Sequence, residues 1–330
     1  MSFRIQTTDR AGGKVYSLHD DATGASASIL PAYGFNLFDL RLPLAGLSRP
    51  VLVAAPDFAD RPGHPAGNGT PILFPFPNRI RNGRFTFEGR AFQLPATNGP
   101  NAIHGFAMAA PWDVLEHKAA SDQAFIVGRY QISKNSPNSI LLWPTDAVLQ
   151  VAYSLSGRRL SMTVTVSNPT AANLPYGFGI HPYFRLPFAS EGDPAHTQVI
   201  LPASKYWVLN EFLPTGEIRP VDARLDFRAG QSRNGLKLDD VLTGLVYQER
   251  RGLARLVDLD LKAEFRLTFD DSVRELVVYT PPQKPNVLAV EPYTQVTDAI
   301  NLEPQGKDAG LRVLAHGRQQ TFSLTMESLG

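Results

Sequence analysis

The sequence predicts an all-β protein, a large antiparallel β-sandwich. Residues 149–155 and 160–166 alternate hydrophobic with polar side chains, and this period of two is typical of strands with one buried face. We find no stretch with the hydrophobic period of a helix of several turns. The 26 glycines and 27 prolines suit a fold with many turns. We expect residues 1–330, of which 43% are hydrophobic, to form a single domain.

Composition excludes several classes of protein. The formal net charge of +1 argues against nucleic acid or an anionic membrane as the main partner. The chain has no cysteine, which excludes disulfides and thiolate metal sites. Met1–Arg10 carries charges and no apolar run, unlike a signal peptide. No apolar run is long enough to span a bilayer. We therefore expect a soluble, cytoplasmic protein.

The N-terminal third reads as short strands joined by turns. We expect strands at 14–18, 25–30 and 35–42, and a loop over Arg61–Asn68, which is rich in proline and glycine. The three prolines between Pro71 and Pro77 exclude helix and disfavour a central strand. Residues 84–94 predict a hairpin with Glu88-Gly89 as its turn.

The remaining strands follow the same alternation. Ser156-Gly157 is expected to be the turn between the strands at 149–155 and 160–166. Phe265, Leu267 and Phe269 repeat the alternation, as do the hydrophobic positions at 322–326. We expect another strand at 242–249, preceded by a loop that contains Asp239 and Asp240.

Two histidines are candidate functional residues. His181 precedes Pro182, which favours extended backbone. Gly177 and Gly179 lie just before it and indicate that something approaches the backbone closely. An imidazole on a rigid segment suits acid/base chemistry or ligand recognition, and a core histidine at a strand end is the alternative. His104 is followed by a glycine in a loop, which is where scaffolds often hold functional side chains.

Polar residues elsewhere are further candidates. Asn78 and Arg79 place an amide beside a guanidinium, a pair suited to hydroxyl groups or a carboxylate. A turn capped by Asn78 beside a solvated Arg79 is the alternative. Asp239 and Asp240 suit a solvated loop cap as well as a ligand contact. Glu291 follows an apolar run and precedes Pro292, so we expect a desolvated carboxylate with a raised pKa at a strand end.

Together these segments resemble the aldose 1-epimerase (galactose mutarotase) family. The matching pieces, in the order found in that family, are Pro75–Gly83, Asn101–Phe106, His181–Phe184, Leu238–Asp240 and Glu291–Leu302. The resemblance implies a galactose mutarotase-like supersandwich fold, a small-molecule sugar as substrate, and no metal or organic cofactor.

The resemblance also implies roles for individual residues. It implies that Glu291 is the base on the sugar C1 hydroxyl, that His181 is the acid on the ring oxygen, and that His104 assists them. It further implies that Arg79 and Asp239 hold sugar hydroxyls and that Asn78 orients Arg79. We choose Asp239 over Asp240 because it directly follows Leu238, as in the pattern of the family.

Three other interpretations stay open. The first is a hexose-6-phosphate 1-epimerase, in which Arg79, Arg81, Arg84 and Arg185 grip a phosphate. The second is a non-catalytic sugar-binding protein of the same fold, which would not need an acid/base pair. The third is a metal hydrolase that uses the two histidines and a carboxylate, although the sequence lacks the close histidine spacing of metal motifs.

Overall fold

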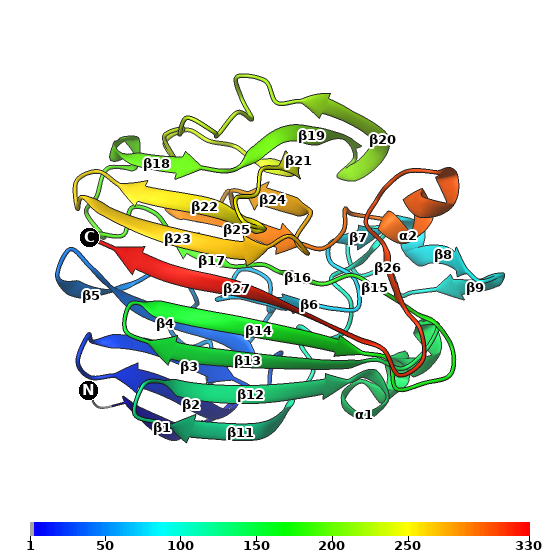
Figure 1. Ribbon diagram of the computed structural model, residues 1–330, viewed down its shortest axis with the longest axis horizontal. Coiled ribbons are helices and arrows are strands. Elements are labelled where there is room, and N and C mark those ends of the chain that lie inside the picture. Colours follow the sequence, from blue (N-terminus) through cyan, green and yellow to red (C-terminus); the bar gives the residue numbers. More distant parts are fainter. Residues whose placement is uncertain (1–2) are drawn as a thin grey trace.

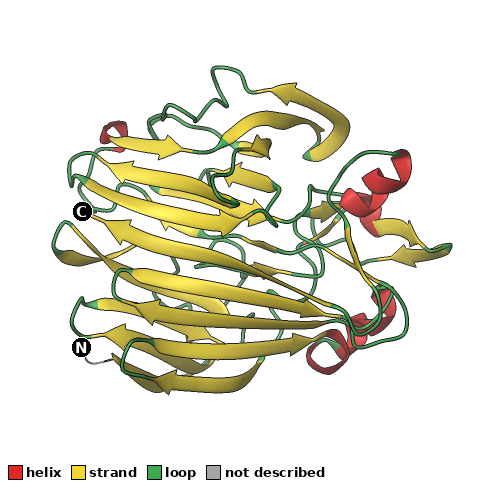
Figure 2. Ribbon diagram, in the orientation of Figure 1, coloured by secondary structure: helices red, strands yellow, loops and turns green. Residues whose placement is uncertain are grey.

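A computed structural model describes residues 3–330; Met1 and Ser2, at the start of the charged N-terminal stretch, lie outside the described residues. Strands dominate, and the helices are short pieces of one or two turns at the edges of the sheets (Figure 2). The helices are α1 (Ile132–Asn135), α2 (Ala299–Leu302) and the 3-10 turns η1 (Arg81–Gly83), η2 (Pro137–Leu142), η3 (Pro194–His196) and η4 (Glu303–Gln305). All named strand pairs are antiparallel, so the predicted fold class is confirmed. No helix among the described residues is long and apolar enough to cross a membrane.

One layer of the sandwich is a sheet of eight strands (Figure 1). In spatial order these are β11 (Asp113–Ala119), β12 (Ala124–Gln131), β13 (Val148–Ser156), β14 (Arg159–Ser167), β27 (Gln319–Leu329), β23 (Ala263–Asp270), β22 (Arg251–Asp258) and β18 (Thr197–Ile200). Its inner face carries the alternating hydrophobic residues predicted from the sequence. Val164, for example, lies between Val151 and Phe322 in the registers of β13 and β27, and all three are buried. Each such side chain contributes about 1.5–3 kcal/mol by burial.

The second layer lies behind this sheet in Figure 1 and consists of two further sheets. The first contains β1 (Phe3–Arg10), β2 (Gly13–Asp20), β3 (Ala25–Leu30), β4 (Asn36–Leu44) and β5 (Leu47–Pro50). The second contains β20 (Leu213–Pro220), β19 (Ala203–Asn210), β21 (Asp239–Leu245), β24 (Glu275–Tyr279), β25 (Val287–Tyr293), β16 (Gly179–Ile180) and β6 (Ile72–Leu73), with β17 (Tyr183–Arg185) paired to β25. Isolated bridges tie Leu37 of β4 to Thr70, just before β6, and Leu52, just after β5, to Phe184 of β17.

The main hydrophobic core lies between the two layers. Phe184 of β17 packs on Phe265 of β23 with ring centroids 4.9 Å apart, and Phe178 packs on Phe322 of β27 at the same distance. The same core contains Leu18 near one end of the chain and Met326 near the other. Segments distant in sequence therefore hold the sheet that carries β24 and β25 in place.

Three short strand pairs complete the fold: β7 (Arg79–Ile80) with β10 (Ala102–Ile103), β8 (Arg84–Phe87) with β9 (Arg90–Gln93), and β15 (Leu174–Tyr176) with β26 (Arg312–Leu314). The β8–β9 pair is the predicted hairpin, and its turn residues Glu88 and Gly89 both have positive φ, as a tight hairpin turn requires. In the β13–β14 hairpin, Ser156 belongs to the strand and pairs with Arg159. The turn there is therefore Gly157–Arg158, one residue later than predicted.

Two other boundaries differ from the sequence prediction. Strand β21 begins at Asp239 and ends at Leu245, so Asp239 and Asp240 lie in a strand and not in a loop. Glu291 lies inside β25, which continues to Tyr293 through Pro292. The neighbouring strand is interrupted between Ile180 and Tyr183. Pro292 has no N–H to donate to a neighbouring strand. It is tolerated in β25 because the strand beside it is broken at this point.

Candidate active site

The candidate site lies on the face of the β24–β25 sheet that points away from the main core. Leu276, Val278, Leu288 and Val290 point into that core. Residues that alternate with them point the other way. Asp239 is in register with Tyr279, and Tyr279 and Tyr183 are both in register with Ala289. Because paired residues share a face, Asp239, Tyr279, Tyr183 and Glu291 lie on the same side.

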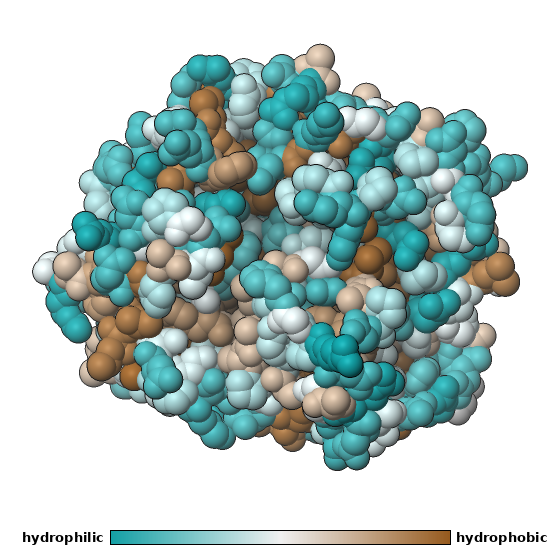
Figure 3. Space-filling model, turned by 180° about the vertical axis from the view of Figure 1, so that it is seen from behind, coloured by the Kyte–Doolittle hydropathy of each residue, from teal (hydrophilic) through white to brown (hydrophobic). Residues whose placement is uncertain are grey.

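This layer faces the viewer in Figure 3, which shows the molecule from behind. The surface there is mostly hydrophilic, with scattered hydrophobic residues, and it is hollowed near its middle. Arg79, Asp239 and Tyr279 are half-buried, whereas His104, His181 and Glu291 are buried. Three of these six side chains are therefore partly accessible to solvent, and the other three are shielded from it.

The centre of the site is a contact between a carboxyl group and an imidazole. Nε2 of His181 lies 3.2 Å from Oε1 of Glu291, and the two residues are 6% and 1% exposed. The Tyr293 hydroxyl donates a hydrogen bond to Oε2 of Glu291. The Tyr183 ring stacks on the His181 ring, with centroids 4.4 Å apart and planes inclined by 12°. Both partners of the acid/base pair are therefore held by a neighbouring tyrosine.

Glycine makes this arrangement possible. A Cβ at Gly179 would lie 2.4 Å from Cδ1 of Tyr293, and one at Gly177 would lie 2.2 Å from the side-chain carbon of Gln295. Neither space admits a methyl group. The prediction that these two glycines mark a close approach to the backbone is confirmed, and the approaching groups are side chains from the end of β25 and just beyond it.

His104 is held beside His181 by the backbone of Asn78. Nδ1 of His104 accepts a hydrogen bond of 3.2 Å from the Asn78 N–H, which leaves Nε2 as the ring nitrogen that carries the proton. The two histidine rings are 5.6 Å apart. His104 has a φ of 64°, and a Cβ at the following Gly105 would lie 2.2 Å from the carbonyl oxygen of Phe74. The glycine therefore permits the turn that directs the histidine.

Arg79 is fixed by three neighbours. Oδ1 of Asn78 accepts hydrogen bonds from Nη1 of Arg79 at 3.1 Å and from its backbone N–H at 2.9 Å. Oδ1 of Asn98 accepts one from Nε at 2.9 Å. The guanidinium carbon also lies 4.9 Å from the centre of the Phe212 ring, a cation–π geometry. The predicted contact between Asn78 and Arg79 is present, whereas no sequence pattern indicated Asn98 or Phe212.

The two neighbouring aspartates point to opposite faces of β21. Asp240 forms a two-point ion pair with Arg224, at 2.7 and 2.8 Å. Asp239 lies on the face that carries Glu291, where the positive charge of Arg79 opposes the burial that raises the pKa of Asp239. The register therefore places Asp239, and not Asp240, in the candidate site.

Burial sets the protonation of the central pair. It raises the pKa of Glu291 well above its ordinary value, while the Tyr293 hydrogen bond and the charge of Arg79 act in the opposite direction. Burial also lowers the pKa of His181 to about 3 and lowers the pKa of His104. Glu291 and His181 are in contact and titrate as a unit. We infer that this unit holds one proton at neutral pH.

The six residues named from the sequence therefore gather in one place. Among residues 3–330, no group of three or more histidine, aspartate or glutamate side chains is arranged to hold a metal ion. Tyr293 was missed by sequence reasoning, although its position two residues after Glu291 on one strand predicts a shared face.

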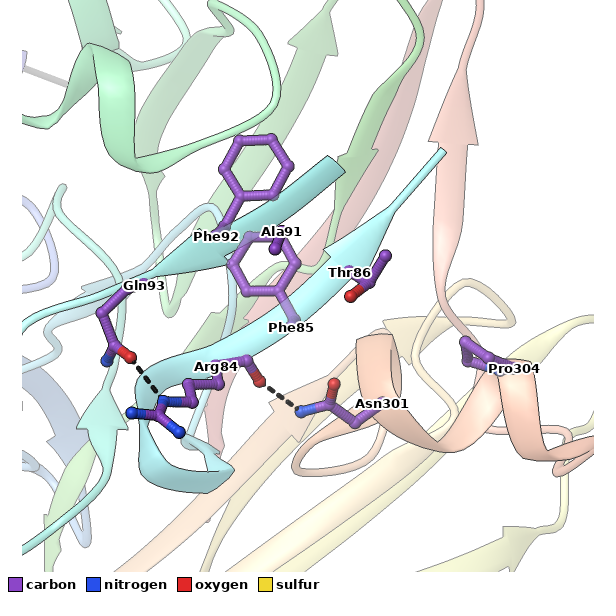
Figure 4. A pocket seen from close by; sticks show the side chains of 8 residues that line it. All are labelled: Arg84, Phe85, Thr86, Ala91, Phe92, Gln93, Asn301 and Pro304. Atoms are coloured by element: carbon purple, nitrogen blue, oxygen red, sulfur yellow. Dashed lines mark hydrogen bonds between the residues drawn. The ribbon is translucent and has the colours of Figure 1, made fainter. Parts of the chain in front are cut away.

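Several hollows of the surface do not include Glu291 or His181. One hollow of about 540 Å³ lies between the β8–β9 hairpin and the segment formed by α2 and η4. Phe85 and Phe92 form part of the wall of this hollow (Figure 4). Another, near Arg185 and Lys284, opens elsewhere. The four arginines of the phosphate interpretation therefore do not converge on one point, since Arg185 lies in a different hollow from Arg81 and Arg84.

The fold matches solved structures of galactose mutarotase-like proteins. One from Clostridium acetobutylicum superposes with a TM-score of 0.90 over 99% of both chains, at 20% sequence identity. The GalM/aldose epimerase homologue from C. elegans superposes with a TM-score of 0.75 over 99% of both chains, at 19% identity. The chain thus has the galactose mutarotase-like β-sandwich fold.

Sequence comparison defines the family. The family model described as aldose 1-epimerase matches residues 14–327, and the chain belongs to that family. The galactose mutarotase of Rattus norvegicus is 30% identical over 146 residues, 44% of this chain and 40% of that protein. The uncharacterized protein YihR of Escherichia coli is 30% identical over 167 residues, 49% of each chain. These matches span about half or less of the curated relatives. The resemblance drawn from the sequence is confirmed at the level of the family.

Proposed function

We propose that the protein is an aldose 1-epimerase that interconverts the α and β anomers of a free hexose. The observation that carries this proposal is the buried contact between Glu291 and His181, which joins a carboxyl group and an imidazole at 3.2 Å. Anomer interconversion requires one group that removes the C1 hydroxyl proton and one that protonates the ring oxygen. A pair that shares one proton supplies both functions.

The reaction balances without any other reactant. Glu291 as carboxylate takes the proton of the C1 hydroxyl, and His181 as imidazolium gives its proton to the ring oxygen as the bond from C1 to that oxygen breaks. The sugar is then an open-chain aldehyde, beside a protonated Glu291 and a neutral His181. Rotation about the C1–C2 bond presents the other face of the carbonyl. The two proton transfers then run in reverse, and the ring closes to the other anomer.

The pKa shifts place the resting proton of the pair on Glu291, and they make the other distribution, a Glu291 carboxylate beside a His181 imidazolium, the more reactive one. A carboxylate whose pKa is raised by burial is a stronger base, and an imidazolium whose pKa is lowered by burial is a stronger acid. The same proton count permits the opposite assignment, with His181 as the base. The hydrogen bond from the Tyr293 hydroxyl favours the ionised form of Glu291, and this supports Glu291 as the base.

The surrounding residues have binding roles in this proposal. Arg79 and Asp239 are half-buried and carry opposite charges on the solvent side of the pair, so they are placed to hold sugar hydroxyls. Asn78 fixes the Arg79 guanidinium. His104, with its Nε2 as donor, contributes a hydrogen bond near the reacting end of the sugar.

The test is polarimetry on freshly dissolved α-D-glucose and α-D-galactose, with and without the protein. We expect the optical rotation to reach its equilibrium value faster with protein than without it. The sample without protein measures the spontaneous rate. Glucose 6-phosphate is the matched comparison. A strong preference for the phosphorylated sugar would support the hexose-6-phosphate alternative. Binding of sugar without acceleration would support a non-catalytic protein.

A further inference from the structure

A hollow of about 380 Å³ lies where β17 and the start of β25 meet the segment that follows β5. Residues 53–56, Arg185 and residues 284–287 line it. Its volume is within the usual range of small-molecule sites, roughly 300–1,000 Å³. Arg185 and Lys284 are the charged residues among those that line it, and both are positive. The described residues that form this wall therefore carry positive charge and no carboxylate.

Arg185 has no counter-ion within residues 3–330. Its Nε is buried without a hydrogen-bond partner, and no carboxylate oxygen of those residues lies within 4.0 Å of its guanidinium nitrogens. Polar groups that are shielded from water normally have a partner. A bound anion would satisfy this charged donor, which the fold itself leaves without an acceptor.

Lys284 is held at this hollow by a hydrogen bond of its own. Its Nζ donates to the carbonyl oxygen of Gly67 at 2.6 Å, and burial lowers the pKa of the ammonium group. An ammonium group has three N–H donors, so two remain for a ligand when Gly67 accepts one. In the described part of the chain Lys284, like Arg185, forms no ion pair with a carboxylate.

A third cation binds the backbone of the same wall. Arg233 is 5% exposed, and its Nη2 donates to the carbonyl oxygens of Pro285 at 2.8 Å and Val287 at 2.9 Å. Its acceptors among residues 3–330 are uncharged carbonyl oxygens, so its positive charge is not offset by a carboxylate. Positive charges that gather without a counter-ion disfavour one another, and a bound anion relieves this repulsion.

Backbone hydrogen bonds fix the segments that carry these cations. Arg185 is in register with Val287, and its N–H donates to the Val51 carbonyl oxygen at 2.8 Å. The carbonyl oxygen of Asn286 accepts a 3.0 Å hydrogen bond from the Leu186 N–H. A ligand therefore meets a wall whose backbone is already in place, which lowers the ordering cost of binding.

The donors of this wall favour an anion over a neutral ligand. Guanidinium and ammonium groups donate hydrogen bonds and cannot accept them, so they suit a ligand whose atoms only accept. The guanidinium fork matches two oxygens of a phosphate, and the ammonium group binds a further oxygen as a point charge. A tetrahedral dianion presents enough oxygens for both groups and enough charge to offset both. A neutral sugar would leave the two charges uncompensated.

We propose that the hollow lined by Arg185 and Lys284 binds a doubly charged tetrahedral oxyanion, either inorganic phosphate or sulfate or the phosphate group of a small ester. The hollow contains neither Glu291 nor His181, so this site is separate from the one assigned to the sugar. The inference goes beyond the proposed function and does not depend on it, because binding of the anion is measured without turnover.

The test is calorimetric titration of the protein with inorganic phosphate, sulfate and glycerol 1-phosphate, at a constant ionic strength maintained with chloride. Lys284→Met and Arg185→Met each remove one positive charge from the hollow. Lys118→Met is the matched control, because Lys118 is exposed on β11 and likewise forms no ion pair within residues 3–330. Denaturant unfolding establishes that each variant is folded.

We expect saturable binding of phosphate to the wild-type protein, and a loss of affinity of about tenfold or more in each hollow variant, because hydrogen bonds to charged groups are the strong ones. Lys118→Met should change the affinity by less than about twofold, since an exposed charge is screened by salt. Tighter binding of glycerol 1-phosphate than of inorganic phosphate would assign the site to an ester, and the reverse order would assign it to the inorganic ion. No saturable binding of the three ligands, or an equal loss in Lys118→Met, would overturn the site.

A second measurement on the wild-type protein replaces a variant that does not fold. Acetic anhydride acetylates accessible lysines, and mass spectrometry of the resulting peptides gives the rate at each position. Phosphate should lower the rate at Lys284 and leave the rate at Lys118 unchanged. Equal rates at Lys284 with phosphate and with chloride would contradict the proposal.

Discussion

The hydroxyl of Tyr293 donates a hydrogen bond to Oε2 of Glu291, two residues earlier on the same strand. Both residues are buried, and the Tyr293 ring occupies the space left by Gly179. The other carboxylate oxygen of Glu291 contacts His181. Tyr293 thus stabilises the ionised form of the carboxyl group and orients its free oxygen toward the imidazole.

The activity should have a bell-shaped pH profile. In our account the active enzyme holds one proton on the Glu291–His181 pair. On the acid side the pair gains a second proton, and burial of His181 moves this limb below the ordinary histidine pKa of 6.5. On the alkaline side the pair loses its last proton, and burial of Glu291 moves this limb above 4.5. Polarimetric measurement of kcat/KM across pH checks this; a profile that rises or falls through a single limb would contradict it.

Replacement of Tyr293 by phenylalanine should alter this profile. Tyr293→Phe removes a hydrogen bond that lowers the pKa of Glu291, so the alkaline limb should move to higher pH. We expect kcat to fall by roughly tenfold with little change in KM, because the carboxyl group is less well oriented.

Tyr153→Phe is the matched control. Tyr153 is also fully buried, and its hydroxyl has no hydrogen-bond partner within the described residues. Its loss should leave the pH limbs in place. If both variants shift the limbs equally, Tyr293 has no special role at Glu291.

Neutralisation of the two adjacent aspartates should separate their roles. Asp239→Asn removes a charge on the face of Glu291 and Arg79, and we expect KM to rise by about tenfold with a smaller change in kcat. Asp240→Asn removes the ion pair with Arg224, so the free energy of unfolding should fall by about 1 kcal/mol or less while KM stays unchanged. Steady-state kinetics and denaturant unfolding of both variants check this, and a larger KM effect at Asp240 would reverse our assignment.

Glu275 should make stability depend on pH. It is fully buried, accepts a hydrogen bond from the Trp207 indole at 3.2 Å, and burial raises its pKa to about 8. Because the folded state holds this proton more tightly than the unfolded chain, the stabilising effect is complete below pH 4.5. It is lost progressively as the pH rises toward 8.

Glu275→Gln should therefore make the free energy of unfolding less dependent on pH. The difference in this free energy between variant and wild type should shift in favour of the variant when the pH rises from 5 to 9. Denaturant unfolding at the two pH values measures the difference. Glu217→Gln is the control, because Glu217 is exposed and paired with Arg219. A wild-type protein as stable at pH 9 as at pH 5, after correction by that control, would contradict the assignment to Glu275.

Local patterns predicted the strands well but not their neighbours. The alternation at Leu324 and Met326 predicts a half-buried strand, yet only the structure shows that β27 lies between β14 and β23. The pairing of β27 with β14, from Ser167 with Gln319 to Arg159 with Glu327, joins distant parts of the sequence, and no local preference specifies such a contact. Register also separated Asp239 from Asp240, since a shift of one residue reverses the face of every side chain.

Residues of the candidate site were predictable where a local backbone requirement restricts which amino acid can occupy a position. Gly179 and the sequence His181-Pro182 mark close packing and an extended backbone, and a carboxylate after an apolar run marks a desolvated group. Phe212 had no such signal, because its contact with Arg79 depends on where a hairpin from another strand pair ends. The Pro292 position was misread for a related reason: its tolerance depends on a gap in the neighbouring strand.

The most direct test of the account is the rate of anomer interconversion by Glu291→Gln. The substitution keeps the shape and the hydrogen-bonding capacity of the side chain but removes its ability to accept a proton. Groups that transfer protons contribute about 10²–10⁴-fold, so we expect polarimetry with freshly dissolved α-D-galactose or α-D-glucose to show kcat lower by roughly that range. KM should change little, because Arg79 and Asp239 remain. A folded Glu291→Gln protein that equilibrates the anomers at the wild-type rate would contradict the proposed mechanism.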